Sequence, residues 1–362
     1  MQQLIDKHRV IVCTGSGGVG KTTLSAALGV MAARSGKRVL VLTIDPARRL
    51  ATALGMDQGG DEVRVPGQAY AGSLHAAMID QSRIFADYIR RYAKDPATVD
   101  ALFGNALYQQ LSTTLSGSQE FTSLAKLVDA ASSGNYDLVI LDTPPAAHAV
   151  DFLHAPKKLN AVFDSTIVSM FMGRTKGFEL ASAAWKMSVK LLLRTLNFVT
   201  GSEFVATFNS FFTAIDAIAP DIRETNLKAH QLLLDPSTAF VLVTSFDQAK
   251  IIEGEAFHGE LDTAGYHLKK VIVNRAWPAW AEPGSAQVDV TQAQLLASGQ
   301  RDWAALHQSL CRYYAERAQA HTTFNSLVKL AEFDAEVVGL PALELLADRL
   351  AQAESYHPVG VH

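Results

Sequence analysis

The residues with the clearest chemical potential lie in a glycine-rich run near the N-terminus, Gly15–Thr22 (GSGGVGKT). Their order fits the pattern G-x-x-x-x-G-K-[ST], in which backbone N–H groups wrap around phosphate oxygens. Lys21 supplies a positive charge for the β- and γ-phosphates, and the Thr22 hydroxyl is a hard oxygen ligand of the kind that Mg²⁺ prefers. The run predicts a site for nucleotide phosphates and Mg²⁺ made by Gly17, Gly18, Val19, Gly20, Lys21, Thr22 and Thr23.

Two carboxylates follow apolar runs that have the character of buried strands. Asp142 comes directly after Leu138–Leu141, and Asp45 comes directly after Val39–Ile44. Because the carboxyl ends of parallel strands line the ligand crevice, both carboxylates are expected beside the phosphate loop. Asp142 would then hold Mg²⁺ through its water shell, and Asp45 would orient or activate an attacking water. Each of them could instead form the turn that leads into the prolines that follow.

These residues need a scaffold, and the first part of the chain predicts one. Val10–Cys13 has the composition of a buried strand, the glycine-rich run follows it, and apolar residues then recur at helical spacing until Gly36. Together with Val39–Ile44 this forms a βαβ unit, which implies parallel strands and a right-handed crossover. Further runs of the buried-strand type are Leu74–Ile79, Leu138–Leu141, Phe240–Thr244, Val271–Val273 and Leu327–Leu330.

Long helical stretches separate the predicted strands, at about 82–133 and 155–235, and about 276–290 has the proline and glycine content of a loop. The expected fold is α/β, a doubly wound and mostly parallel sheet of the P-loop NTPase kind with helical insertions. We expect residues 1–362 to form a single P-loop ATPase domain, with the two helical stretches as insertion segments.

Composition excludes several classes of protein. Of 362 residues, 48% are hydrophobic and 19% are charged, which is typical of a folded globular chain. The net charge of -4 provides no strong positive field, so nucleic acid is not an expected partner. Only two cysteines are present, which fits a reducing compartment. No signal peptide or membrane-spanning run is visible, so we expect a cytoplasmic protein with at most peripheral membrane contact.

The motifs Thr43–Ala47 (TIDPA) and Asp142–His148 (DTPPAAH), joined to the phosphate loop, resemble the ArsA family. This family comprises the arsenite-pump ATPases and the related ATPases that target tail-anchored membrane proteins. Gly117–Glu120 (GSQE) also looks like the family's P-G-x-x-E segment, with Ser116 where proline is usual. The resemblance covers most of the chain. It implies an ATPase that uses ATP and Mg²⁺ and works as a dimer.

The resemblance also implies roles for individual residues. Asp45 would position the water from a first switch, and Asp142–His148 would form a second switch that senses the γ-phosphate, although His148 fits a structural role equally well. Asn274 would hydrogen-bond the adenine, and Ala331–Glu336 would cover the base. Independently, Asn274 is not followed by the K-x-D pattern that would place an aspartate on guanine, which favours ATP over GTP.

One departure from the family pattern concerns catalysis. The family carries a signature lysine where this chain has Ser16. That lysine reaches the partner's nucleotide across a dimer and stabilises transition-state charge, the role of an arginine finger in trans. A homodimer of this chain should therefore hydrolyse ATP slowly, unless another cation substitutes. Arg48 and Arg49 are nearby, although a solvated surface role is favoured for both. Alternatively, the chain is a weakly hydrolysing regulatory or scaffold subunit that pairs with a lysine-bearing paralogue.

A second departure concerns metal and metalloid binding. The chain has no Cys-x-x-Cys, so the zinc clamp between subunits of the eukaryotic targeting branch is not expected. Cys13 lies in a predicted buried strand and is interpreted as core. The metalloid-binding cysteines of the arsenite pumps have no counterpart here, and arsenite handling is therefore not expected.

Apolar stripes in the second helical stretch leave two interpretations open. Phe204–Ile215 and Ile167–Met172 present large apolar side chains at helical spacing. In the targeting branch such helices form a groove for apolar protein segments. Ordinary core packing also explains most of these residues and is the favoured interpretation. The sequence does not identify a client or a pathway.

Overall fold

The computed structural model describes residues 1–44, 49–56, 62–79, 81–92, 95–105, 117–144, 220–281, 286–319, 324, 327–333 and 335–353. The chain forms two compact units. The first unit consists of Met1–Ile79, Asp129–Val150 and Leu232–His362, and the second consists of Asp80–Val128 and Asp151–Gln231. The second unit therefore takes its residues from two stretches that interrupt the first unit along the sequence.

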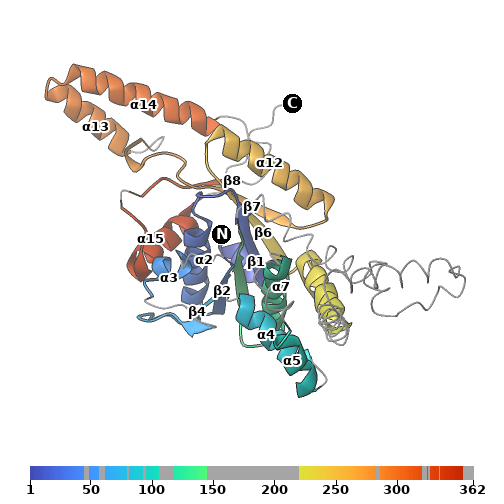
Figure 1. Cartoon of the computed structure of the whole chain (residues 1–362). Coiled ribbons are helices and arrows are strands. Elements are labelled where there is room, and N and C mark those ends of the chain that lie inside the picture. The colour runs from blue at the N-terminus through green and yellow to red at the C-terminus, as the bar shows by residue number, and fades with distance from the viewer. Residues whose placement is uncertain are drawn as a thin grey trace, which may run out of the picture. The chain divides into compact units, whose positions relative to one another are not determined.

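The first unit is built on an eight-stranded sheet with the strand order β3-β4-β2-β5-β1-β6-β7-β8 (Figure 1). Adjacent strands run parallel, except that β3 is antiparallel to β4. The expected α/β class and mostly parallel sheet are thus confirmed. The strands are β1 (Val10–Gly15), β2 (Arg38–Thr43), β3 (Val63–Arg64), β4 (Ser73–Met78), β5 (Leu138–Asp142), β6 (Thr238–Thr244), β7 (Leu268–Val273) and β8 (Leu327–Lys329).

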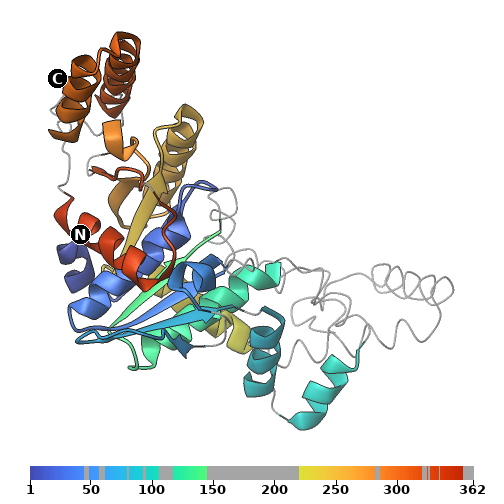
Figure 2. The same cartoon turned by 90° about the vertical axis from the view of Figure 1, so that its left-hand side faces the viewer.

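Helices cover both faces of this sheet. On one face α2, α3 and α15 pack together, and Figure 2 shows the red α15 beside the blue α2. On the other face lies α12, because Leu242 of β6 points toward Gly254 of that helix whereas Val241 and Val243 join the core around α2. The helices of this unit are α1 (Gln2–Lys7), α2 (Lys21–Arg34), α3 (Arg49–Leu54), α12 (Gln248–Thr263), η1 (Ala279–Ala281), α13 (Ala286–Ala297), α14 (Arg301–Gln319) and α15 (Gly339–Gln352).

The core surrounds the two elements that carry the phosphate loop. All six residues of β1 are buried, and α2 is buried along most of its length between the sheet and α15. Small residues make this possible: a side chain at Gly29 would lie 2.7 Å from Val41 and 2.9 Å from Leu74. Cys13 is fully buried in this core, as predicted, and burial raises the pKa of its thiol to about 12. The loop is therefore held between two immobilised elements.

The described part of the second unit is helical. It contains α4 (Gln81–Tyr92), α5 (Pro96–Phe103), the start of α7 (Gly117–Ser132) and most of a helix over 220–234. These elements agree with the helical stretches predicted at 82–133 and at the end of 155–235. The apolar stripes Phe204–Ile215 and Ile167–Met172 lie outside the described residues. No helix in the described ranges is long and apolar enough to cross a membrane.

The region between β7 and β8 differs from the sequence-based expectation. The stretch about 276–290 was expected to be a loop, but it contains the short helix η1 and the start of α13. The helices α13 and α14 lie side by side as an antiparallel pair (Figure 1). The sequence before this pair contains prolines and a glycine, which predict a loop. The helix that follows was not predicted because the helical periodicity of apolar residues in α13 is weak.

Candidate functional site

The glycine-rich run connects the end of β1 to the start of α2 and has the backbone of an anion-binding loop. Gly18 and Gly20 have φ values of 78° and 89°, in the left-handed region that favours glycine. Gly20 is the N-cap residue of α2 and has no side chain with which to cap the helix. The N–H groups of the first turn and the positive end of the helix dipole can therefore bind an anion.

Gly15 is required where β1 enters the loop. Its φ is 142°, and a Cβ atom there would lie 1.9 Å from the carbonyl oxygen of Val243 on the neighbouring strand β6. This contact is with backbone, which cannot move without breaking the pairing of β1 with β6. The close approach of the two strands fixes the direction in which the loop leaves the sheet.

We expect Gly15→Ala to destabilise the protein by at least about 3 kcal/mol, because overpacking against backbone adds to the conformational strain. Gly36→Ala is a matched control: Gly36 has a φ of 96°, and a Cβ there would meet nothing within 4 Å. Strain alone should cost that variant about 1–2 kcal/mol. Urea unfolding of both variants checks the difference. Equal losses for the two would contradict the contact with Val243.

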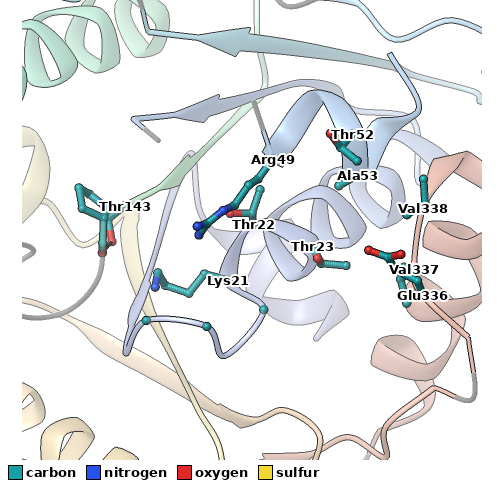
Figure 3. Close-up of a pocket in the computed structure, with 14 residues that line it drawn as sticks. Lys21, Thr22, Thr23, Arg49, Thr52, Ala53, Thr143, Glu336, Val337 and Val338 are labelled. Atoms are coloured by element: carbon teal, nitrogen blue, oxygen red, sulfur yellow. Dashed lines mark hydrogen bonds between the residues drawn. The ribbon is translucent and has the colours of Figure 1, made fainter. Parts of the chain in front are cut away.

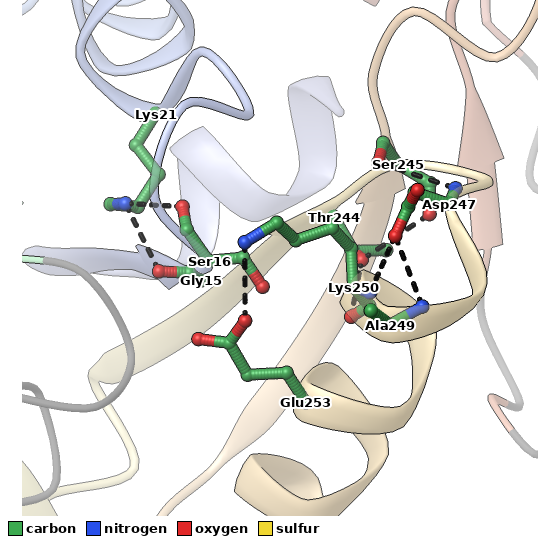
Figure 4. Close-up of polar contacts among 9 residues, drawn as sticks. All are labelled: Gly15, Ser16, Lys21, Thr244, Ser245, Asp247, Ala249, Lys250 and Glu253. Atoms are coloured by element: carbon green, nitrogen blue, oxygen red, sulfur yellow. Dashed lines mark hydrogen bonds and ion pairs between the residues drawn. The ribbon is translucent and has the colours of Figure 1, made fainter.

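Lys21 is held at the centre of the loop. Its Nζ donates hydrogen bonds to the carbonyl oxygens of Gly15, at 3.0 Å, and Ser16, at 2.8 Å (Figure 4). The residue is only 8% exposed, so its positive charge acts in an environment of low effective dielectric. The ammonium group is thus fixed beside the loop amides, where a phosphate would meet both.

Asp142 meets the start of α2 at the carboxyl ends of the central strands. In the sheet register Asp142 pairs with Cys13 on β1 and with Thr43 on β2. Its Oδ2 accepts hydrogen bonds from Thr22 Oγ1 at 2.7 Å and from Thr43 Oγ1 at 2.9 Å, and the residue is 1% exposed. The structure therefore brings together Thr22 and Asp142, the two residues that the sequence predicts for Mg²⁺.

The donor set at this point suits a magnesium ion. A hydroxyl oxygen and a carboxylate oxygen lie 2.7 Å apart beside Lys21, and Mg²⁺ prefers hard oxygen ligands completed by water and substrate phosphates. Among the described residues, no group of three or more His, Cys, Asp or Glu could hold a metal ion by itself. A site of this kind would thus depend on nucleotide phosphates for its remaining ligands.

A cavity of about 310 Å³ opens above the loop (Figure 3). Its volume lies within the usual range for small-molecule sites. The predicted phosphate-binding residues make up much of its wall, and the remainder comes from α3, the end of β5 and the segment before α15. The lining residues are Gly17, Gly18, Gly20, Lys21, Thr22, Thr23, Arg49, Thr52, Ala53, Thr143, Pro144, Glu336, Val337 and Val338.

A second cavity of about 420 Å³ shares Gly20, Thr23, Glu336 and Val337 with the first, so the two adjoin. The predicted base-binding elements lie here, because the cavity is lined by Asn274 and by residues of the segment 331–336. The region predicted for the phosphates and the region predicted for the base therefore adjoin at the start of α2.

Asn274 also contacts the phosphate loop directly. Its Nδ2 donates a hydrogen bond to the carbonyl oxygen of Val19 at 2.8 Å. A Cβ on Gly20 would lie 2.5 Å from the same nitrogen, so a side chain there would displace Asn274 from this contact, and the positive φ itself favours glycine. Val19 itself is buried in the core and contributes its backbone to this contact. The side chain of Asn274 thereby connects the region predicted for the base with the phosphate loop.

Some predicted site residues fall outside the described residues, namely Asp45 and His148. Gly117–Glu120 begin α7, but their side chains are not described. Thr43 was not given a role from the sequence. It is the second partner of Asp142, and its position at the end of β2 is the signal that could have shown it. Arg49, weighed as a substitute cation but favoured as a surface residue, is exposed and also lines the first cavity.

The parallel sheet, the glycine loop between β1 and α2, and the group formed by Lys21, Thr22 and Asp142 define a P-loop NTPase. A family model described as anion-transporting ATPase, the ArsA ATPase family, matches residues 8–352. The chain therefore belongs to the ArsA family of ATPases.

Individual relatives resemble the chain over most of its length. The ATPase GET3 of Podospora anserina is 25% identical over 356 residues, which cover 97% of this chain and 94% of the relative. A putative arsenical pump-driving ATPase 1 of Aquifex aeolicus is 24% identical over 345 residues, covering 94% of this chain and 78% of the relative. An ATPase ASNA1 homolog 2 of Paramecium tetraurelia is 24% identical over 262 residues, covering 72% and 74%.

Proposed function

We propose that this ArsA-family ATPase binds and hydrolyses ATP with Mg²⁺ in the two adjoining cavities, and that its nucleotide state controls closure of a dimer. The observation that carries the proposal is the hydrogen bond to Asp142 from Thr22, which lines the phosphate cavity together with Lys21. This arrangement places a cation that could bind the phosphates next to two oxygen atoms that could bind a metal.

Each residue then has a distinct part in the reaction. Lys21 and the loop amides would bind the β- and γ-phosphates, Thr22 would hold the metal directly, and Asp142 would hold it through water. When bound, Mg²⁺ would neutralise charge that develops on the phosphate oxygens. On the sequence alone, Asp45 remains the proposed residue for positioning the attacking water. Asn274 and the segment 331–336 would bind the adenine.

Dimer closure is the proposed response to nucleotide state. The partner would be a second copy of the chain or a paralogous subunit, and the helical second unit would bind a client or partner. Apolar protein segments are one class of client that such helices fit, whereas nucleic acid is not expected at a net charge of -4. Nucleotide state would reach the helical unit through the switch segments that begin at Asp45 and Asp142.

Sedimentation equilibrium of the purified chain tests this proposal, with no nucleotide, with ADP, and with a non-hydrolysable ATP analogue and Mg²⁺. We expect the analogue to shift the chain from monomer toward dimer and ADP to do so less. The same distribution in all three conditions would contradict nucleotide-driven formation of the dimer. Displacement of the bound analogue by ATP and by GTP tests the preference for adenine. Equal displacement by the two nucleotides would contradict the proposed role of Asn274.

A second candidate function is that of a weakly hydrolysing regulatory or scaffold subunit. Ser16 favours it, because this position holds no cation and the residue is only 1% exposed. Within the described residues its hydroxyl has no hydrogen-bond partner and cannot act as a charged group across a dimer. Tight ATP binding without turnover by the wild type, with turnover restored by Ser16→Lys or by a lysine-bearing paralogue, would establish this function.

A further inference from the structure

We propose that Arg49 is a catalytic residue of this ATPase and supplies, from within the same chain, the cation that Ser16 cannot provide. The inference rests on the proposed function, since it concerns the γ-phosphate of ATP bound in the phosphate cavity. It changes the expectation for turnover: a chain that carries its own cation at the γ-phosphate does not depend on a lysine from a partner.

The position of Arg49 is set by a buried anchor. Arg49 is the first residue of α3, and Leu50 and Leu54 of that short helix are buried in the core. The helix packs on α2, whose first turn lines the phosphate cavity, and on α15. The backbone of Arg49 is therefore fixed at the rim of the cavity while its side chain remains exposed and able to reach inward.

The side chain is directed at the phosphate region. Arg49 lines the same cavity as Lys21 and Thr22. Figure 3 shows its guanidinium group pointing from α3 toward the side of the cavity that Lys21 and Thr22 occupy, whereas the Glu336 carboxylate lies on another side beside Thr23. The two cations of this cavity thus converge on the place where the terminal phosphate would lie.

Other cations near the loop are arranged differently. Lys250 lies near the start of α12, where its Nζ is 3.4 Å from Glu253 Oε2, and it lines neither cavity (Figure 4). Arg275 lines only the second cavity, and its Nε lies 3.6 Å from Glu332. Among the described residues that line the phosphate cavity, Lys21 and Arg49 are the only lysine and arginine. Arg49 is therefore the candidate that the geometry selects.

The chemistry of a guanidinium group suits this place. In phosphoryl transfer, charge spreads over the equatorial oxygens of the transferred group, and an arginine in cis can stabilise that charge in the transition state. The planar fork of N–H donors matches two phosphate oxygens at once, which an ammonium group does not. In the reaction, water attacks the γ-phosphorus, the bond to the β,γ-bridging oxygen breaks, and ADP and inorganic phosphate leave; Arg49 exchanges no proton.

The test compares Arg49→Ala and Arg49→Lys with the wild type, using kcat for ATP hydrolysis and the Kd for ATP measured separately. We expect Arg49→Ala to lower kcat about 100-fold, while the Kd for ATP rises by less than about fivefold, because the contact strengthens in the transition state. Arg49→Lys should keep part of the rate, since it keeps the charge but loses the fork. Binding of ADP with aluminium fluoride, which mimics the transition state, should weaken more than binding of ATP.

Arg312→Ala is the matched control, because Arg312 is an exposed arginine on α14 that lines neither cavity; its kcat should equal that of the wild type. Wild-type turnover by Arg49→Ala would overturn the inference, and so would ATP binding without turnover in the wild type. If one of these two results is found and Lys21→Ala still abolishes ATP binding, the proposed nucleotide site at the loop is retained and only the catalytic role of Arg49 is rejected. If the wild type does not bind ATP at all, both the proposed function and the role of Arg49 are rejected.

Discussion

Lys21→Ala should lower kcat/KM for ATP by about 1000-fold, the larger part through ATP affinity. The ammonium group would make charge-assisted hydrogen bonds to the β- and γ-phosphates, each of about 1.5–3 kcal/mol. Its removal also releases the carbonyl oxygens of Gly15 and Ser16, which Lys21 Nζ holds at 3.0 Å and 2.8 Å. The loop would then lose both its charge and part of its internal support. Titration of a fluorescent ATP analogue, beside steady-state hydrolysis, measures the two effects.

Lys250→Ala is the control for Lys21→Ala. The two side chains have the same chemistry, but the Lys250 ammonium group pairs with Glu253 and lines neither cavity. This partly exposed pair contributes little to stability and lies outside the predicted phosphate site, so we expect ATP affinity to change by less than about twofold. A large loss in both variants would indicate a general effect of positive charge. Unchanged affinity in Lys21→Ala would contradict phosphate binding at the loop.

Asp142→Asn should lower kcat by about 1000-fold, because the metal supplies several kcal/mol of charge stabilisation in reactions of this kind. The asparagine keeps the shape of the side chain and an oxygen that can accept from Thr22, so the fold should survive. What disappears is the negative charge that attracts the metal. The apparent Mg²⁺ concentration for half-maximal hydrolysis should therefore rise at least about tenfold.

Thr43→Val tests whether the hydrogen bond from Thr43 to Asp142 serves stability alone or also metal binding. Thr43 Oγ1 donates to Asp142 Oδ2 at 2.9 Å but does not line the phosphate cavity. We expect a loss of about 1–3 kcal/mol in the free energy of unfolding, since a buried hydrogen bond is removed, and a much smaller change in the Mg²⁺ dependence than in Asp142→Asn.

For Asp142→Asn, a Mg²⁺ dependence equal to that of the wild type would contradict the assignment of this carboxylate to the metal.

Much of the fold follows from local signals in the sequence. Each predicted buried strand is present, with ends that shift by up to three residues, because uninterrupted apolar runs such as Leu138–Leu141 suit only the inside of a parallel sheet. The strand β3 was missed because two exposed residues, Val63 and Arg64, carry no periodicity. The helix pair α13 and α14 was missed because the prolines that precede it read as a continuing loop.

The site residues could be predicted where a single segment of the sequence shows both the kind of residue and its place in the fold. Lys21 and Thr22 belong to a local motif, and Asp142 ends a strand whose place in the sheet is set by its apolar run. Contacts between distant segments were not predictable in this way. The hydrogen bond from Asn274 to Val19 joins residues 255 positions apart. Arg49 was interpreted as a surface residue, because only the packing of α3 on α2 shows that its side chain lines the cavity.

Steady-state ATP hydrolysis by the purified chain alone, with and without Mg²⁺, tests most directly whether the phosphate cavity is a self-sufficient catalytic site. We predict Mg²⁺-dependent release of inorganic phosphate that Lys21→Ala abolishes and that needs no added partner, since Lys21 and Arg49 line the same cavity. Tight ATP binding with no phosphate release, restored only by Ser16→Lys or by a lysine-bearing partner, would contradict this prediction and identify the chain as the dependent half of a shared site.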